Sequence, residues 1–156
     1  MTDISASMYG MFALLSMALR TLVDELQEHS AQAGFGDVRP AHGFVFQRLA
    51  PDGATGNELA EHLGITKQAA SQMIDYLEER GYVARQPHPT DKRGKLIVLT
   101  SKGWDNIHST EAIMSKLEAQ WANLIGRENL EQLRFSLRHL VFAANEGTLP
   151  ALKPIW

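Results

Sequence analysis

The middle of the chain contains two short amphipathic segments separated by one glycine, and this pattern limits the fold more than any other feature. Thr55 and Glu58 have the spacing of a capping box, which predicts a helix that starts after Thr55 and ends at Gly64. Thr66 can cap a second helix, and Gly81 is a suitable residue to end it. Two helices joined by a tight turn that contains glycine are a helix-turn-helix in outline.

The segment after this helix pair predicts a β-hairpin. Residues 82–86 and 96–99 are short apolar stretches, and the loop between them, residues 88–95, contains proline and several charged side chains. A hairpin appended to a helix-turn-helix is a wing. The sequence therefore predicts a winged helix-turn-helix.

Further helices are predicted on both sides of this unit, because apolar residues recur there at steps of three and four. We expect these helices at residues 7–33, at residues 40–49, in a segment that begins near Ser101 with Ser101 as its cap, and at residues 128–146. The fold class is then mainly α with a small antiparallel β-wing.

The two terminal helices each carry an apolar stripe that nothing else in the chain obviously covers. A second copy of the chain could cover both stripes, which predicts a homodimer. Packing of the stripes within one chain is the alternative. The stripes comprise Met8, Phe12, Leu15, Leu19, Leu22 and Leu26 in the first helix and Leu130, Leu133, Leu137, Leu140 and Ala144 in the last.

Positive charge is concentrated around the predicted hairpin, although the chain has a formal net charge of −3. Between residues 80 and 95 the only carboxylate is Asp91, and this local excess of cations is the electrostatic footprint that DNA binding requires. An arginine at a hairpin tip can enter the minor groove, and Arg93 is the candidate for that role. Solubility is the alternative reason for a basic loop. The cations are Arg80, Arg85, Lys92, Arg93 and Lys95.

The second helix of the pair presents mainly uncharged polar side chains near its start. Glutamine can bond to adenine through two hydrogen bonds, and serine or threonine can bond to several base edges. A recognition helix contacts bases mainly through its N-terminal residues, so these side chains are candidates for reading DNA. A solvated helix surface is the alternative. The candidates are Lys67, Gln68, Ser71 and Gln72.

Several classes of function have no starting point in the sequence. The chain contains no cysteine, which excludes disulfides, thiolate zinc sites and thiol redox sensing. Its six histidines are scattered without a metal-ligand spacing, and no catalytic motif is present, so we expect no metal, no cofactor and no enzymatic activity. The apolar run at residues 8–19 is shorter than the roughly 20 residues that span a bilayer. We therefore expect no membrane association and a cytoplasmic location.

Four motifs of the chain resemble those of the MarR family of bacterial regulators. They are residues 57–66 (NELAEHLGIT), 77–83 (LEERGYV), 91–93 (DKR) and 99–103 (LTSKG). The motif-bearing region covers residues 55–103, and flanking helices of the right number and order extend the resemblance over nearly the whole chain. The specificity of the match lies in the D-x-R wing followed by L-T-x-x-G.

The resemblance implies a homodimeric, sequence-specific transcriptional regulator that binds a pseudo-palindromic operator in double-stranded DNA, and we expect it to be an effector-responsive repressor. Residues 1–36 and 101–147 would form a helical dimerisation lobe, residues 37–100 a DNA-binding lobe, and residues 148–156 an irregular tail. Small aromatic or phenolic effectors would bind in a cleft between the lobes. The implied DNA-binding residues are Thr66, Lys67, Gln68, Ser71 and Gln72 in the helix and Asp91, Lys92, Arg93 and Lys95 in the wing, with Asp91 expected to orient the loop.

Two other classes of protein fit the same elements. A winged helix can bind another protein, in which case its basic wing would meet an acidic partner. The chain could also be a small-molecule-binding protein or an enzyme with a vestigial wing, and the lack of a catalytic constellation argues against the enzyme.

Overall fold

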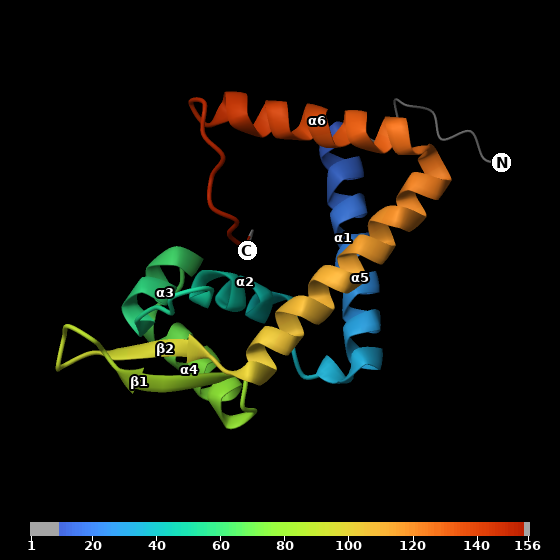
Figure 1. Cartoon of the computed structure of the whole chain (residues 1–156). Helices are drawn as coiled ribbons and strands as arrows, with labels where there is room; N and C mark the ends of the chain where they lie inside the picture. The colour runs from blue at the N-terminus through green and yellow to red at the C-terminus, as the bar shows by residue number, and fades with distance from the viewer. Residues whose placement is uncertain (1–9, 155–156) are drawn as a thin grey trace.

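The computed structural model describes residues 10–154, which form six α-helices, one π-helical turn and one two-stranded sheet (Figure 1). The predicted fold class, mainly α with a small antiparallel wing, is confirmed. The elements are α1 (Met11–Ser30), η1 (Ala31–Phe35), α2 (Pro40–Leu49), α3 (Gly56–Leu63), α4 (Lys67–Glu79), β1 (Val83–Pro87), β2 (Lys95–Leu99), α5 (Ser101–Ile125) and α6 (Arg127–Ala144).

The elements form two groups that the long helix α5 connects. α2, α3, α4 and the hairpin lie together at one end of the molecule, whereas α1 crosses α5 and α6 leaves the C-terminal end of α5 at an angle (Figure 1). The N-terminal half of α5 contacts α2 and β2, and the helix continues to α1 and α6. α5 therefore contacts elements of both groups.

The helix-turn-helix forms as its capping residues predict. The Thr55 hydroxyl oxygen accepts a hydrogen bond from the backbone N–H of Glu58, and the Glu58 carboxylate accepts one from the N–H of Thr55. Gly64 ends α3 with a φ of 67°, a left-handed conformation that glycine adopts without strain. The Thr66 hydroxyl oxygen then accepts from the N–H of Ala69 and caps α4.

The wing is an antiparallel hairpin that is attached to the helices by a third segment. Val83 lies opposite Leu99 and Pro87 opposite Lys95, one residue from the predicted limits. Ala54, just before α3, exchanges backbone hydrogen bonds of 2.8 and 3.0 Å with Ile97 of β2. The start of α3 is therefore held beside the wing.

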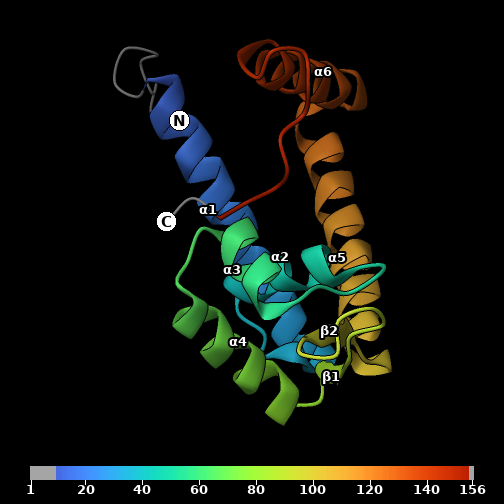
Figure 2. The same ribbon diagram turned by 90° about the vertical axis from the view of Figure 1, so that its left-hand side faces the viewer.

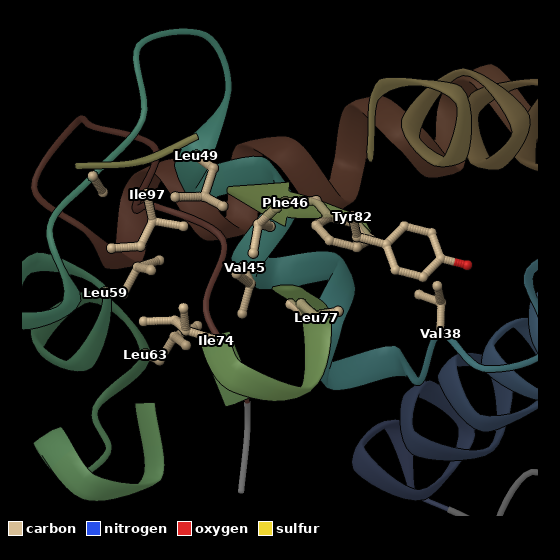
Figure 3. Close-up of a cluster of buried hydrophobic side chains, with 12 residues drawn as sticks. Val38, Val45, Phe46, Leu49, Leu59, Leu63, Ile74, Leu77, Tyr82 and Ile97 are labelled. Carbon is tan, nitrogen blue, oxygen red and sulfur yellow. The ribbon is translucent and has the colours of Figure 1, made fainter. Parts of the chain in front are cut away.

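The hydrophobic core lies among α2, α3, α4 and the wing (Figure 3). The Phe46 ring packs against the Tyr82 ring with 5.7 Å between their centroids, and Leu77 of α4 is fully buried in the same cluster. The Tyr82 hydroxyl donates to the Asp37 carboxylate at 2.6 Å, which satisfies the only polar atom of that side chain. This core fixes α4 relative to the wing.

Two predicted helix limits are wrong. Thr100, not Ser101, caps α5: the Thr100 hydroxyl oxygen accepts from the N–H of Gly103, and Ser101 is the first helical residue. The first helix begins at Met11, because Gly10 is extended, and not at the predicted Ser7, which with Met8 lies outside the described residues. At its other end Gly34 breaks the helix as predicted, since its φ of 95° is not helical, although the hydrogen-bond pattern of η1 runs across it to Phe35.

The apolar stripes of the terminal helices stay largely uncovered within one chain. Phe12 of α1 is 86% exposed and Leu140 of α6 is 64% exposed, and Leu15, Leu19 and Leu133 are also exposed. Leu130 is the one member of the α6 stripe in the buried class among the described residues. Within residues 10–154, no helix is long and apolar enough to cross a membrane.

Candidate nucleic-acid interface

One face of α4 is exposed, while the opposite face packs on the core. Ala70, Ile74 and Leu77 are buried against the core, and every one of the five candidate residues at the other side is exposed. Because the Thr66 oxygen accepts the capping hydrogen bond, its hydroxyl hydrogen can still be donated to another group. The exposed candidates are Thr66, Lys67, Gln68, Ser71 and Gln72.

The wing loop is shaped by Asp91 and His88. The Asp91 carboxylate accepts a hydrogen bond of 2.9 Å from the backbone N–H of Arg93, and its carbonyl oxygen accepts one from Gly94. His88 Nδ1 accepts from the backbone N–H groups of Thr90 and Asp91. These bonds order the tip without using the side chains of its cations, which supports an orienting role for Asp91.

Four exposed cations surround the gap between α4 and the wing. Lys67 begins α4, and Lys92, Arg93 and Lys95 belong to the wing loop and the first residue of β2. None of them forms an ion pair with a residue in the described range. Their charges are therefore available to phosphate groups.

The other two cations of the predicted basic cluster have carboxylate partners, although Arg85 also lines the gap between α4 and the wing. Arg85 pairs with Asp75 and with Glu78, two carboxylates of α4 that neutralise its charge. The Arg80 guanidinium lies 3.5 Å from the ring centroid of Tyr76 and bonds to Glu79 at the C-terminal end of α4. The local excess of positive charge is therefore smaller in space than residues 80–95 indicate, because Asp75 and Glu78 precede that stretch but pair with Arg85.

A groove of about 440 Å³ separates α4 from the wing, and Figure 2 shows these two elements on the same side of the molecule. It brings together Lys67, Ser71, Asp91 and Lys95 of the predicted set. Gln68, Gln72, Thr66, Lys92 and Arg93 lie outside its lining, on the exposed surfaces at either side.

Sequence reasoning missed the part of this groove that the start of α3 forms, where Thr55 and Asn57 line it. They reach the wing because Ala54 pairs with Ile97, a contact between residues far apart in the chain. No local pattern in the sequence indicates that pairing. Asn57 is exposed and can offer its side-chain amide to the same ligand as Lys67.

Comparison with known proteins finds proteins that are similar to this chain. Residues 44–94, which contain the helix-turn-helix, β1 and the wing loop up to Gly94, match the model of the MarR family. Among solved structures, the transcriptional repressor CouR bound to a 23-mer DNA duplex is 25% identical with a TM-score of 0.69, covering 90% of this chain and 98% of that one.

Two further structures share the fold. The reduced form of MarR from E. coli is 23% identical with a TM-score of 0.73, and the match covers 85% of this chain and 97% of that one. A MepR mutant from S. aureus bound to an oligodeoxyribonucleotide is 22% identical with a TM-score of 0.63, covering 87% and 99%. The chain is therefore similar to the MarR family over residues 44–94, and it shares the winged helix-turn-helix fold of these structures over most of its length.

Proposed function

We propose that this chain is a sequence-specific DNA-binding transcriptional regulator. The observation that carries the proposal is the exposed polar face of α4 beside four cations that have no ion-pair partner among the described residues. Uncharged polar groups on a helix suit base edges in the major groove, and unpaired cations beside it suit phosphates. CouR and MepR, which share the fold, have been seen bound to DNA.

Each predicted residue has a role in this proposal. Gln68 and Gln72 read base edges in the major groove, with Ser71 and Thr66 as shorter donors to bases or phosphates. Lys67, Lys92 and Lys95 contact phosphates. Arg93, at the wing tip, enters the minor groove, and Asp91 holds the loop that carries it.

We propose that the regulator is a homodimer. The exposed apolar side chains of α1 and α6 would be covered by the same surface of a second copy, as two-fold symmetry requires. Residues 1–36 and 101–147 form the dimerisation lobe in this proposal, residues 37–100 the DNA-binding lobe and residues 148–156 the tail. Two copies of α4 would then read a pseudo-palindrome with half-sites about 10 bp apart.

The proposed regulator is a cytoplasmic repressor whose DNA affinity a small effector lowers. CouR, which shares the fold and is a transcriptional repressor, supports repression. α5 contacts elements of both lobes, so it would transmit the effect of a bound effector from one lobe to the other. An effector acts only if it binds the two states of the protein with different affinity, typically by 1–3 kcal/mol. No catalytic role is proposed.

A competition titration tests DNA recognition. The purified chain is titrated with the DNA that flanks its own gene, with random DNA of equal length as competitor. Specific binding should survive the competitor, and Arg93→Ala should weaken it. Lys116→Ala is the matched control, because Lys116 is an exposed cation on α5 outside the interface and its loss changes the net charge equally.

The titration can give two results that contradict part of the proposal, and each has a different meaning. Binding that the random competitor abolishes, with the same affinity for every sequence, would favour a winged helix that binds an acidic protein partner. If Arg93→Ala bound this DNA with the same affinity as the wild type, only the proposed role of the wing tip would be contradicted.

A further inference from the structure

His88 follows β1 directly, and its ring faces the backbone of the wing loop. Its Nδ1 accepts hydrogen bonds from two backbone N–H groups, that of Thr90 at 3.2 Å and that of Asp91 at 3.1 Å. The Thr90 hydroxyl oxygen lies 3.4 Å from the same nitrogen. In an Asx-turn, the side-chain oxygen of an aspartate or asparagine accepts such a bond from the backbone that follows it. His88 Nδ1 takes the place of that oxygen, so the start of the wing loop depends on a histidine that acts as an acceptor.

These bonds determine which form of the His88 ring the loop requires. A backbone N–H can only donate, so Nδ1 must keep its lone pair, and the neutral ring then carries its proton on Nε2. A proton on Nδ1 would make that nitrogen a donor that points at two other donors. A histidine side chain ordinarily changes its charge between about pH 5 and 8, whereas an asparagine at the same place would accept over that whole range.

Asp91 connects His88 to the wing tip. Its N–H donates to His88, its carboxylate accepts from the N–H of Arg93 at 2.9 Å, and its carbonyl oxygen accepts from the N–H of Gly94. The carbonyl oxygen of Gly94 accepts in turn from the N–H of His88 at 3.3 Å. These bonds form a closed ring that contains the backbone of Arg93. Loss of the bonds to Nδ1 would release Asp91 and, with it, the backbone of Arg93.

We propose that His88 is a positioning residue of the wing tip, and that the tip presents Arg93 in one fixed position only while His88 Nδ1 carries no proton. The bonds to Nδ1 exist only in the ordered loop, so a proton on Nδ1 favours conformations that lack them. Operator recognition should therefore weaken as the pH falls. That consequence for DNA rests on the proposed function, whereas the dependence of the loop on His88 does not.

Charged groups of both signs lie around His88. The carboxylate of Glu58 on α3 interacts electrostatically with His88, and Asp91 is bonded to its ring, so these two residues attract a proton. Three exposed cations of the same loop and of the start of β2 oppose that proton, namely Lys92, Arg93 and Lys95. Because these charges act in opposite directions, the backbone bonds to Nδ1 are the interactions that favour one form of the ring consistently.

A pH titration of the full-length ¹⁵N-labelled protein by NMR, without DNA, tests the loop itself. As the pH falls from 7.5 to 5.5, the amide signals of Thr90, Asp91 and Arg93 should move together with the ring signals of His88. In His88→Asn these amide signals should stay in place over the same range, because the asparagine oxygen accepts the same bonds and does not titrate. His108→Asn is the matched control at an exposed position of α5 and should titrate as the wild type does.

The effect on recognition is measured as the ratio of operator affinity to random-DNA affinity at both pH values. A protonated His88 adds a positive charge that strengthens binding to every sequence, and the ratio removes this effect. Between pH 7.5 and 5.5 the ratio should fall about threefold more in the wild type than in His88→Asn. His88→Ala, which has no acceptor, should lower the ratio about fivefold at pH 7.5, as expected for the loss of one hydrogen bond, and His88→Asn should restore it. The other histidines are the same in all these proteins, so their titration cancels.

Three results would overturn the proposal: amide signals of Thr90 and Asp91 that do not follow the His88 ring, a wild-type ratio in His88→Ala, or the same pH dependence in His88→Asn and the wild type. A chain whose loop signals follow His88 but that binds no operator contradicts only the proposed function. A chain that binds operator with a loop that does not respond to His88 contradicts only the role of His88.

Discussion

Arg85 and Arg93 are arginines of the same hairpin, yet their surroundings give them different roles. Arg85 is held between Asp75 and Glu78, so it joins α4 to the wing. Arg93 bonds only through its backbone N–H, to Asp91, and its guanidinium has no ion-pair partner within the described residues. Arg85 therefore stabilises the contact between α4 and the wing, whereas the Arg93 guanidinium is available to DNA in the proposed function.

Substitution of these two arginines should separate stability from binding. Arg85→Ala should lower the free energy of unfolding by about 1 kcal/mol, because it leaves two carboxylates without their cation at a partly exposed site. Arg93→Ala should leave the free energy of unfolding unchanged and weaken operator binding. Urea unfolding and the DNA titration, made on both variants, check this. Loss of stability in Arg93→Ala would contradict the assignment.

His42 is a buried histidine whose protonation opposes folding. Its ring stacks on Tyr76 at 5.0 Å between centroids, and its Nδ1 accepts a hydrogen bond of 3.0 Å from the backbone N–H of Arg39. Burial lowers the pKa of His42 below its ordinary value, and the nearby charges of Arg39 and Arg80 lower the pKa further, against a smaller opposite effect of Asp37.

The sign of the resulting pH dependence follows from this direction. Because the pKa of His42 is lower in the folded than in the unfolded chain, the unfolded chain binds more protons below pH 6.5 or so. The contribution of His42 to stability is complete above that pH and is lost as the pH falls. Between pH 7.5 and 5.5, the fall in the free energy of unfolding should therefore be smaller in His42→Gln than in the wild type.

The control for His42 is the exposed His108 of α5. His108→Gln should keep the pH dependence of the wild type. If His42→Gln also kept it, burial of His42 would not be the source of the effect.

At the scale of elements, the crossing of α5 over the end of the wing depends on a glycine. A Cβ on Gly103 would lie 2.4 Å from the backbone oxygen of Tyr82 and 3.0 Å from Leu99. Gly103 also donates its N–H to the Thr100 cap, so its backbone cannot shift freely. The glycine of the L-T-x-x-G motif thus allows α5 to leave β2 in close contact with the winged unit.

Gly103→Ala should lower the free energy of unfolding by about 1–3 kcal/mol, the usual cost of forcing extra volume into packed structure. Gly43→Ala is the matched control inside α2, where an added Cβ meets no atom within 4 Å. It should raise the free energy of unfolding by about 0.5–1 kcal/mol, because alanine favours a helix over glycine. Urea unfolding of both variants measures the two effects, and equal effects would contradict the close contact at Gly103.

At the scale of the whole molecule, the chain exposes more apolar surface on α1 and α6 than a soluble monomer normally does. The exposed side chains include Phe12 and Leu19 on α1 and Leu133, Phe135 and Leu140 on α6. Burial of these residues against a second copy would remove them from water, and the hydrophobic effect would stabilise the dimer.

Leu140→Glu should convert the dimer to a monomer, because the carboxylate would be buried in an apolar interface without a partner. Analytical ultracentrifugation should show half the mass of the wild type at the same concentration. Gln132→Glu, which adds a carboxylate at an exposed polar position of α6, should remain dimeric. A monomeric wild type would contradict the proposal of a homodimer.

The sequence by itself determined the helix-turn-helix and the wing, because their signals are local. A threonine cap and a glycine with positive φ act within a few residues, and so the limits of α3 and α4 agree with the capping residues in the chain. The exposure of Gln68 and Gln72 was predictable for the same reason, since the helical period sets which side faces the core.

Only the tertiary structure decided which charges and which groove these elements create. Arg85 is neutralised because folding places α4 against β1, and Asn57 joins the groove because Ala54 pairs with Ile97. Each of these contacts joins residues from different elements of the chain. The local sequence of one element does not show which other element it packs against, so no local pattern could reveal these contacts.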